Sequence, residues 1–369
     1  MIVTVTSSPP LPSLTDEVAT TTTRTVRSKN KNSQEKAILP NEIILSSKTV
    51  SKLTAIESQI GQDDGNRGMK ALIQNGDLHS AAKLVCSLPP KSHIILMSGF
   101  PCCVQHDPPT ETDGPPGTVA LVQCALALGY RVTLVTDECN KDVFLAAVHD
   151  FQKEDQFEFQ TFSPKIDPKE SLSLEEEWKM EQLVQSADLV MACERAGPSK
   201  DGNCYTMRGI NMTKHGLIAP LERIVHRVRE LRNKDIKFIA IGDGGNEMGM
   251  GKAIDAIRNS PKIKNGDLIG AVTPADFLIA ASVSNWGGYA LSAAIALVKS
   301  QDCAEKNLKE WVESCVPTVG SEVALLKRCV SKGCRDGVSG LMESTVDGMP
   351  LNTSMHSLRR IRSIVLAQD

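Results

Sequence analysis

The sequence predicts an α/β fold with a doubly wound, mostly parallel sheet and helices on both faces. Short apolar runs recur between residues 93 and 282, and their length suits buried strands. Segments with helical periodicity separate these runs, so strands and helices alternate along the chain. Five or more buried strands in such an alternation favour a doubly wound sheet over an antiparallel one.

Two segments are expected before the main domain, which we assign to residues 90–369. Residues 1–46 are expected to be a disordered tail, because the first 36 residues are rich in Thr, Ser and Pro and lack an apolar core of the kind found in secretion signals. Residues 47–89 show helical periodicity up to a Pro-Pro pair, which predicts flanking helices.

The main domain begins with a strand, a helix and a second strand, which together form one βαβ unit. These three elements are expected at residues 93–100, 118–129 and 131–138. Further strands are expected at residues 157–162, 187–194, 237–241 and 276–282. Helices are expected near residues 140–150, around residues 174–183, and at residues 220–231, 285–300 and 319–332.

Composition and charge narrow the class of ligand. With 41 basic and 44 acidic residues the net charge is -3, so neither nucleic acid nor an anionic membrane surface is expected as a partner. No run of 18 apolar residues occurs, so no membrane-spanning segment is expected. A small molecule is therefore the expected partner, while the oligomeric state is not predicted.

The cysteines favour a reducing compartment. There are 11 of them, without a CxxC pair or regular spacing, which argues against a disulfide framework and a zinc ribbon. The adjacent residues Cys102 and Cys103 have two interpretations, a redox or metal site and two incidental thiols in a loop.

A glycine-rich segment, IGDGGNEMGMG at residues 241–251, begins at the end of an expected strand. It does not match the dinucleotide fingerprint, because the sixth position counted from Gly242 is Glu247. It does not match a Walker A loop, because Asn246 replaces the first glycine and Ala253 the hydroxyl residue. No nucleotide cofactor is therefore expected.

The acids of this segment point to a small ligand. The glycines would let the backbone turn sharply, while Asp243 and Glu247 act on the ligand or hold a divalent cation. The alternative is a glycine-rich turn with a solvated Asp243 and a helix-capping Asn246.

Other polar segments also follow expected strands, and they would meet at the edge where such sheets bind ligands. Residues 194–209, ERAGPSKDGNCYTMRG, contain two arginines whose planar side chains match a carboxylate; the alternative is an exposed loop with ordinary surface charges. Asp113 precedes a proline-started helix that could hold an anionic group, or it is only a turn residue. Asn285 faces the ligand or caps the helix that it begins.

Three motifs in order, SGFPC…PPTETDGPPGT, ERAGPSKDGNCYTMRG and IGDGGNEMGMGK, resemble the carboxyl-terminal domain of the D-glutamate cyclase family over roughly residues 90–350. The resemblance implies a lyase that converts D-glutamate to 5-oxo-D-proline with loss of water, in the mitochondrial matrix. That reaction needs a base for the α-amine, a charge that masks the γ-carboxylate, and a clamp for the α-carboxylate.

Under this resemblance we expect Asp243 or Glu247 to be the general base or a ligand of Mg²⁺ or Mn²⁺, with Asn246 orienting the substrate. Arg208, or failing it Arg195, is expected to bind a substrate carboxylate. The remaining members of the expected polar lining are Asp201, Asn203, Tyr205 and Glu194, the last of which would fix an arginine or the substrate ammonium group.

Two other functions stay open. One is a nucleotide- or sugar-phosphate-handling enzyme on the same fold, since fold alone does not determine function. The other is a non-catalytic protein that binds an acidic metabolite.

Overall fold

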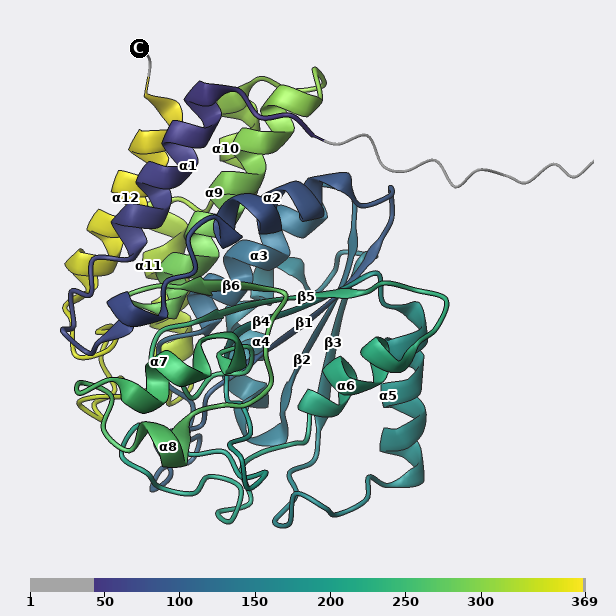
Figure 1. Ribbon diagram of the computed structural model, residues 1–369, viewed down its shortest axis with the longest axis vertical. Coiled ribbons are helices and arrows are strands. Elements are labelled where there is room, and N and C mark those ends of the chain that lie inside the picture. The colour runs from purple at the N-terminus through teal and green to yellow at the C-terminus, as the bar shows by residue number, and fades with distance from the viewer. Residues whose placement is uncertain (1–42, 368–369) are drawn as a thin grey trace, which may run out of the picture. The chain divides into compact units, whose positions relative to one another are not determined.

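The computed structural model describes residues 43–367, which form one compact unit (Figure 1). The tail expected at residues 1–46 therefore lies outside the described residues, except for residues 43–46. Within residues 43–367 no helix combines the length and the apolar character needed to cross a membrane.

A six-stranded sheet lies at the centre, and all its strand pairs are parallel. Its strands are β1 (His93–Gly99), β2 (Arg131–Asp137), β3 (Phe157–Phe162), β4 (Leu189–Arg195), β5 (Lys237–Gly242) and β6 (Phe277–Ala280). They are arranged in the order β3-β2-β1-β4-β5-β6, which is the strand order of the Rossmann fold. The predicted doubly wound α/β fold is confirmed, and each strand lies on an apolar run that predicted it.

Helices cover both faces of the sheet (Figure 1). They are α1 (Ser47–Ile60), α2 (Asp77–Ser87), α3 (Pro115–Ala127), α4 (Lys141–Ala147), α5 (Leu174–Ser186), α6 (Glu222–Glu230), α7 (Ile254–Asn259), α8 (Gly266–Ile269), α9 (Ser284–Asp302), α10 (Leu308–Cys315), α11 (Val319–Ser331) and α12 (Leu351–Leu366). The sequence analysis did not anticipate α7, α8, α10 and α12.

The alternation of side chains along each strand divides the interior into two cores. In β1, Ile94 and Leu96 face the core formed with α3 and α9, whereas Ile95 and Met97 face the core formed with α5 and α6. Helix α9 is buried on all sides from Ser284 to Val298, because α2, α3, α10 and α12 pack around it. The sheet is thus buried on both faces, as a parallel sheet requires.

The two helices that precede the sheet pack into this same unit. Helix α1 contacts α9 and α12, and α2 contacts α9 and β6. The segment between them, residues 61–76, runs beside the carboxyl end of β6, where Asp63 N–H bonds to the hydroxyl of Ser282. The chain before residue 90 therefore reaches the carboxyl edge of the sheet.

Candidate functional site

A cavity of about 320 Å³ lies beyond the carboxyl ends of β1, β4 and β5. Strands β1 and β4 are the neighbours at which the strand order reverses, and ligands of doubly wound sheets bind at this point. The volume is at the small end of the roughly 300–1,000 Å³ typical of ligand pockets, so it suits a small metabolite. The charged residues in its wall are Glu111, Glu194, Asp243, Glu247, Asp347, Arg67, Arg208, Lys262 and Lys264.

Glu247 anchors the glycine-rich loop that follows β5. Its Oε1 accepts the backbone N–H groups of Asp243 at 3.0 Å and Gly244 at 2.6 Å, and its Oε2 accepts that of Gly245 at 2.7 Å. Gly245 has a φ of 105°, which an L side chain rarely adopts, so the loop requires glycine at this position. The burial of the Glu247 carboxylate among glycines is thus stabilised within the loop itself, because the carboxylate accepts the backbone N–H groups that the turn leaves free.

Asp243 is held by an arginine from the segment between α1 and α2. Arg67 Nη2 donates to Asp243 Oδ2, to Asp347 Oδ2 at 2.9 Å and to the carbonyl oxygen of Ser282 at 3.0 Å. Three segments that are far apart in the sequence therefore meet at one guanidinium group. Burial raises the pKa of Asp243 well above its usual range against the opposing effect of Arg67, and the nearby charge of Asp347 raises it further.

Glu194 lies at a β-bulge in β4. Ser98 pairs with Cys193 and Gly99 pairs with Arg195, so Glu194 is the extra residue on its strand. Its φ of 43° is uncommon for a residue other than glycine, and such bulges are frequent next to binding sites. The bulge directs the buried Glu194 into the cavity, where its Oε2 accepts a hydrogen bond from Ser284 Oγ at 2.5 Å.

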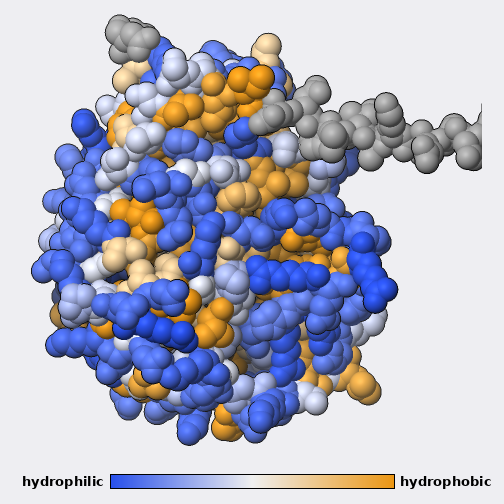
Figure 2. All heavy atoms as spheres, in the orientation of Figure 1, coloured by the Kyte–Doolittle hydropathy of each residue, from blue (hydrophilic) through white to orange (hydrophobic). Residues whose placement is uncertain are grey.

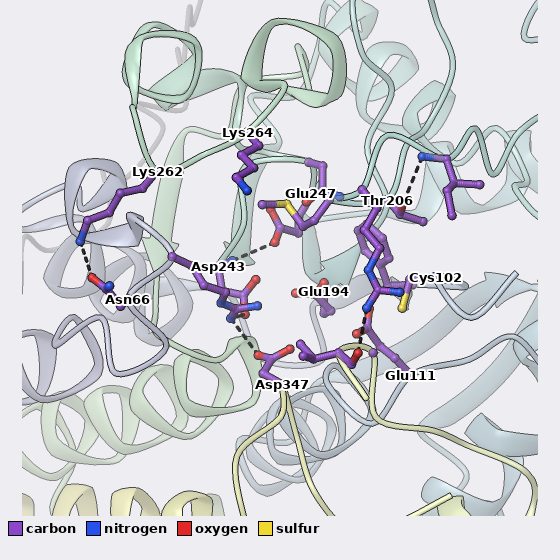
Figure 3. Close-up of a pocket in the computed structure, with 18 residues that line it drawn as sticks. Asn66, Cys102, Glu111, Glu194, Thr206, Asp243, Glu247, Lys262, Lys264 and Asp347 are labelled. Carbon is purple, nitrogen blue, oxygen red and sulfur yellow. Dashed lines mark hydrogen bonds and ion pairs between the residues drawn. The ribbon is translucent and has the colours of Figure 1, made fainter. Parts of the chain in front are cut away.

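Two further carboxyl groups share this electrostatic environment (Figure 3). Burial raises the pKa of Glu194 and of Glu111 well above the usual range, and neighbouring carboxylates add to both shifts. Figure 3 shows Glu111, Glu194, Asp243 and Asp347 around one space, with Glu247 at its upper wall. Burial therefore favours the protonated form of several acids in this cavity, and perturbed acids of this kind cluster at functional sites.

Asp113 and Asn285 lie behind the cavity wall and cap each other's helices. Asp113 accepts the backbone N–H groups of Ser284 and Asn285, both at 2.8 Å, at the start of α9. Asn285 Oδ1 accepts those of Gly114 at 3.0 Å and Gly117 at 2.8 Å, at the start of α3. Burial, with the charge of Asp347 in addition, raises the pKa of Asp113 to about 8. Asn285 thus binds the start of α3 and not that of α9, the helix that it was expected to cap, and neither Asn285 nor Asp113 lines the cavity.

The carboxylates offer donor sets for a cation. Among the described residues, two sets of three acids bring one oxygen each to within 4.8 Å of one another. The first set is Asp113, Asp243 and Asp347, and the second is Glu194, Asp243 and Glu247. Oxygen donors of this kind fit Mg²⁺ or Mn²⁺, and Asp243 belongs to both sets.

Arg195 lies outside the cavity, contrary to the role expected for it. Its guanidinium group is fully buried, pairs with Asp137 and donates to the carbonyl oxygen of Ala219 at 2.8 Å. Asp137 in turn accepts the backbone N–H of Ala219 at 2.7 Å. These bonds hold the start and the end of the 196–221 segment against β2, which leaves the guanidinium group turned away from the pocket.

The other polar residues of this segment bond mainly to one another. Tyr205 Oη donates to Asp201 Oδ2 at 2.6 Å, and Asn203 Nδ2 donates to the same oxygen at 2.9 Å. None of the three lines the cavity. Asn246 does line it, but its side-chain amide donates to the carbonyl oxygen of Tyr205 at 2.7 Å, which ties the glycine-rich loop to the segment.

Two kinds of cation stand at the mouth of the cavity. Arg208, the expected ligand of a substrate carboxylate, is exposed there and donates to the carbonyl oxygen of Val338 at 2.8 Å. Lys262 and Lys264 come from the segment between α7 and α8, over which the surface is mostly hydrophilic (Figure 2). Lys262 bonds to Asn66, whereas Lys264 points toward the acids (Figure 3).

The sequence analysis missed Arg67, Asp347 and Lys264 as site residues, and it did not single out Glu111. Arg67 and Asp347 lie in loops 176 and 280 positions away from their partners, so no local pattern connects them. Glu111 belongs to the ETDGPPGT segment, whose position after β1 was the available signal.

Comparison with known proteins identifies the family of this chain. The family described as "D-glutamate cyclase-like, C-terminal" matches residues 56–362. This chain belongs to that family. The match to the D-glutamate cyclase-like family begins before Arg67 and ends after Asp347, so it includes every acid and cation of the cavity described above.

The chain is also similar in sequence to a human protein. It is the protein named "D-glutamate cyclase, mitochondrial" from Homo sapiens, with 32% identity over 335 residues. The matched region covers 86% of this chain and 52% of the human protein. This member of the D-glutamate cyclase-like family thus spans about half the length of its human relative.

Proposed function

We propose that this chain cyclises D-glutamate to 5-oxo-D-proline with loss of water, as a lyase. The observation that carries the proposal is the acidic cavity at the switch point of the sheet, in a chain of the D-glutamate cyclase-like family. A small amino acid carries both an ammonium group, which carboxylates attract, and carboxylates, which the cations at the mouth attract. A phosphate-bearing ligand is less well supported, because the buried acids would repel it.

The reaction moves two protons in total from the substrate nitrogen to the departing oxygen. The α-ammonium group loses both, the bond between nitrogen and the γ-carbon forms, and one γ-carboxyl oxygen leaves as water. Acids whose pKa is raised by burial bind a proton more readily than exposed acids, which suits them to take up and return such protons. Asp243, Glu194 and Glu111 meet this condition and line the cavity. Glu247 is less suited than expected, because backbone N–H groups already occupy its carboxylate.

The same proposal includes a divalent cation, Mg²⁺ or Mn²⁺. Asp243 would hold it, together with Asp113 and Asp347 or with Glu194 and Glu247. A cation bound there would neutralise the charge of the γ-carboxylate and polarise its carbonyl group.

Lys264 and Arg208 are the groups that we propose for the substrate carboxylates. Both line the cavity: Arg208 lies in the loop that follows β4, and Lys264 lies in the segment between α7 and α8 and points toward the acids (Figure 3). Their placement would orient the ammonium group toward the acids, and holding a near-attack geometry supplies much of the rate of a ring closure.

A proton NMR time course tests the proposal. The purified chain is incubated with D-glutamate, and separately with L-glutamate, with Mg²⁺ or Mn²⁺ and then with a chelator. We expect 5-oxoproline signals from the D form alone and a lower rate after chelation. A folded chain that binds D-glutamate without converting it would contradict the proposal and favour a metabolite-binding protein.

A pair of matched variants separates chemistry from folding. Asp243→Asn keeps the shape of the side chain but removes its charge, and we expect it to lose turnover. Asp150→Asn removes an exposed acid at the opposite edge of the sheet, and we expect it to keep turnover. Circular dichroism on both variants shows whether the fold is retained.

We also propose that the protein acts in the mitochondrial matrix, in keeping with the name of the human relative. Fractionation of cells that express the full-length protein tests this, and recovery outside mitochondria would contradict it.

A further inference from the structure

The vicinal thiols Cys102 and Cys103 form part of the cavity region. They follow β1, and their Sγ atoms lie 4.0 Å apart. Cys102 lines the cavity, whereas Cys103 is buried behind it with 8% exposure. Cys103 N–H donates to the carbonyl oxygen of Pro109 at 3.0 Å, and His106 N–H donates to that of Cys103 at 2.9 Å, so the pair sits in a compact turn.

The two thiols differ in acidity. The hydrogen bond from Cys102 lowers the pKa of Cys103, and the charge of Arg335 lowers it further. The same bond raises the pKa of Cys102, with burial and the adjacent Glu111 acting in the same direction. Cys103 is therefore the more readily ionised thiol, and Cys102 is the thiol that reaches the cavity.

We propose that Cys102 and Cys103 form a reversible disulfide when a small two-electron oxidant such as hydrogen peroxide reaches the pair. The Cys103 thiolate attacks the peroxide, its O–O bond breaks, and one water leaves as Cys103 becomes a sulfenic acid. Cys102 sulfur then attacks Cys103 sulfur, the S–S bond forms, and a second water leaves. Two thiols are oxidised, and one peroxide is reduced to two waters.

The adjacent positions make this disulfide easy to reduce. Consecutive Cα atoms are about 3.8 Å apart, below the roughly 4.4–6.8 Å found for most disulfides. The resulting ring is strained, and strained disulfides have more oxidising potentials than relaxed ones. The pair would thus open again in a reducing compartment, as a reversible modification requires.

Closure of the disulfide would alter the cavity wall. A Cβ atom placed on Gly337 would clash with Glu111 Oε2 and come within 3.1 Å of Cys102 Sγ, so these three groups are packed closely together. To bond, the two sulfur atoms must approach from 4.0 Å to about 2.05 Å, so the close packing of Cys102 against Glu111 and Gly337 must adjust. Glu111 lines the cavity, so its position depends on the state of the pair.

Mass spectrometry of the full-length protein tests the disulfide. After treatment with hydrogen peroxide, we expect the loss of two hydrogen atoms, a crosslink mapped to the peptide that contains Cys102 and Cys103, and reversal by dithiothreitol. Cys102→Ser and Cys103→Ser should each abolish the crosslink. Cys303→Ser, which removes another partly exposed thiol, should leave it intact. An unchanged thiol count, or a crosslink confined to other cysteines, would overturn the proposal.

A second readout tests the order of the two thiols. Under peroxide, Cys102→Ser should accumulate a sulfenic acid on Cys103 that dimedone labels, because the resolving thiol is absent. Cys103→Ser should give much less label on Cys102. Equal labelling of the two variants would overturn the assigned order.

The effect on turnover rests on the proposed function and is measured separately. In a chain that cyclises D-glutamate, the oxidised form should turn over more slowly and recover with dithiothreitol. A mapped crosslink with unchanged turnover would overturn the link to the cavity. Absence of turnover in the reduced form would count against the proposed function, while the crosslink alone would still decide the disulfide.

Discussion

Replacing Glu247 by glutamine tests whether this residue anchors the loop or takes part in chemistry. The substitution keeps the size of the side chain but removes one acceptor oxygen and the negative charge. In the structure the carboxylate accepts three backbone N–H groups, from Asp243, Gly244 and Gly245. A glutamine can accept from Asp243 and Gly244 through its oxygen, but its amide would then face the N–H of Gly245.

The expected cost follows from these contacts. One hydrogen bond to a charged acceptor is worth about 1.5–3 kcal/mol, and a buried donor left without a partner costs about 1–3 kcal/mol. The two hydrogen bonds that remain, from Asp243 and Gly244, are weaker because their acceptor is no longer charged. Because these terms overlap, we expect Glu247→Gln to lower the free energy of unfolding by about 2–4 kcal/mol. The glycine-rich loop should loosen and D-glutamate turnover should fall with it.

Urea unfolding at neutral pH measures the stability, and the NMR time course measures turnover on the same preparations. Glu154→Gln makes the same chemical change at an exposed position before β3, so it serves as the control for the loss of one charge. If Glu247→Gln unfolds within about 0.5 kcal/mol of the unchanged protein but has lost turnover, the anchoring argument is wrong. Glu247 would then act on the substrate, as the sequence analysis allowed.

Three other predictions concern single side chains. Lys264→Gln should raise the KM for D-glutamate about tenfold with little change in kcat, whereas Lys262→Gln, whose ammonium group bonds to Asn66, should change neither in steady-state kinetics. Arg67→Met should lower the free energy of unfolding by about 3 kcal/mol, measured with urea, because it leaves two buried carboxylates without their cation. Burial raises the pKa of Glu322 from 4.5 to about 7, so its contribution to stability is fully present below about pH 4.5 and is lost as the pH rises to about 7. Glu322→Gln stays neutral, so above pH 7 it should be more stable than the unchanged protein by about 3 kcal/mol, and equal stability at pH 8 would refute the assignment.

The fold could be predicted because its signals are local. Four of the six strands are mainly apolar segments of four to seven residues, β2 and β3 mix polar with apolar residues, and the helices between the strands are periodic, so all are visible within short windows. Helices α10 and α12 were missed although each has a buried face. The role of their apolar faces is clear only in the structure, where both helices pack against α9.

The site could be predicted only where it follows a strand. Asp243, Glu247 and Glu194 lie at the ends of β4 and β5, and the edge rule for parallel sheets brought them together. Arg67 and Asp347 are single residues in turns, and an isolated arginine or an Asp-Gly pair is common in any exposed loop. Arg195 was misplaced because its charge is visible in the sequence, while its buried partner Asp137 belongs to a different strand.

A buried carboxylate needs a partner that offsets its charge, so the partners of the cavity's acids indicate which class of ligand suits them. Glu247 is compensated by backbone donors, and Asp243 and Asp347 share Arg67. Among the described residues, Glu194 and Glu111 have only neutral neighbours at hydrogen-bonding distance, the hydroxyl of Ser284 and the thiol of Cys102.

Two buried acids with neutral partners gain most from a positive charge that arrives with the ligand. An ammonium group or a divalent cation brings that charge, whereas a phosphate group brings the opposite one. The charge balance of the cavity therefore favours an amino acid over a nucleotide or sugar phosphate. The glycine pattern alone does not make this distinction, because glycine-rich turns after a strand serve both classes of ligand.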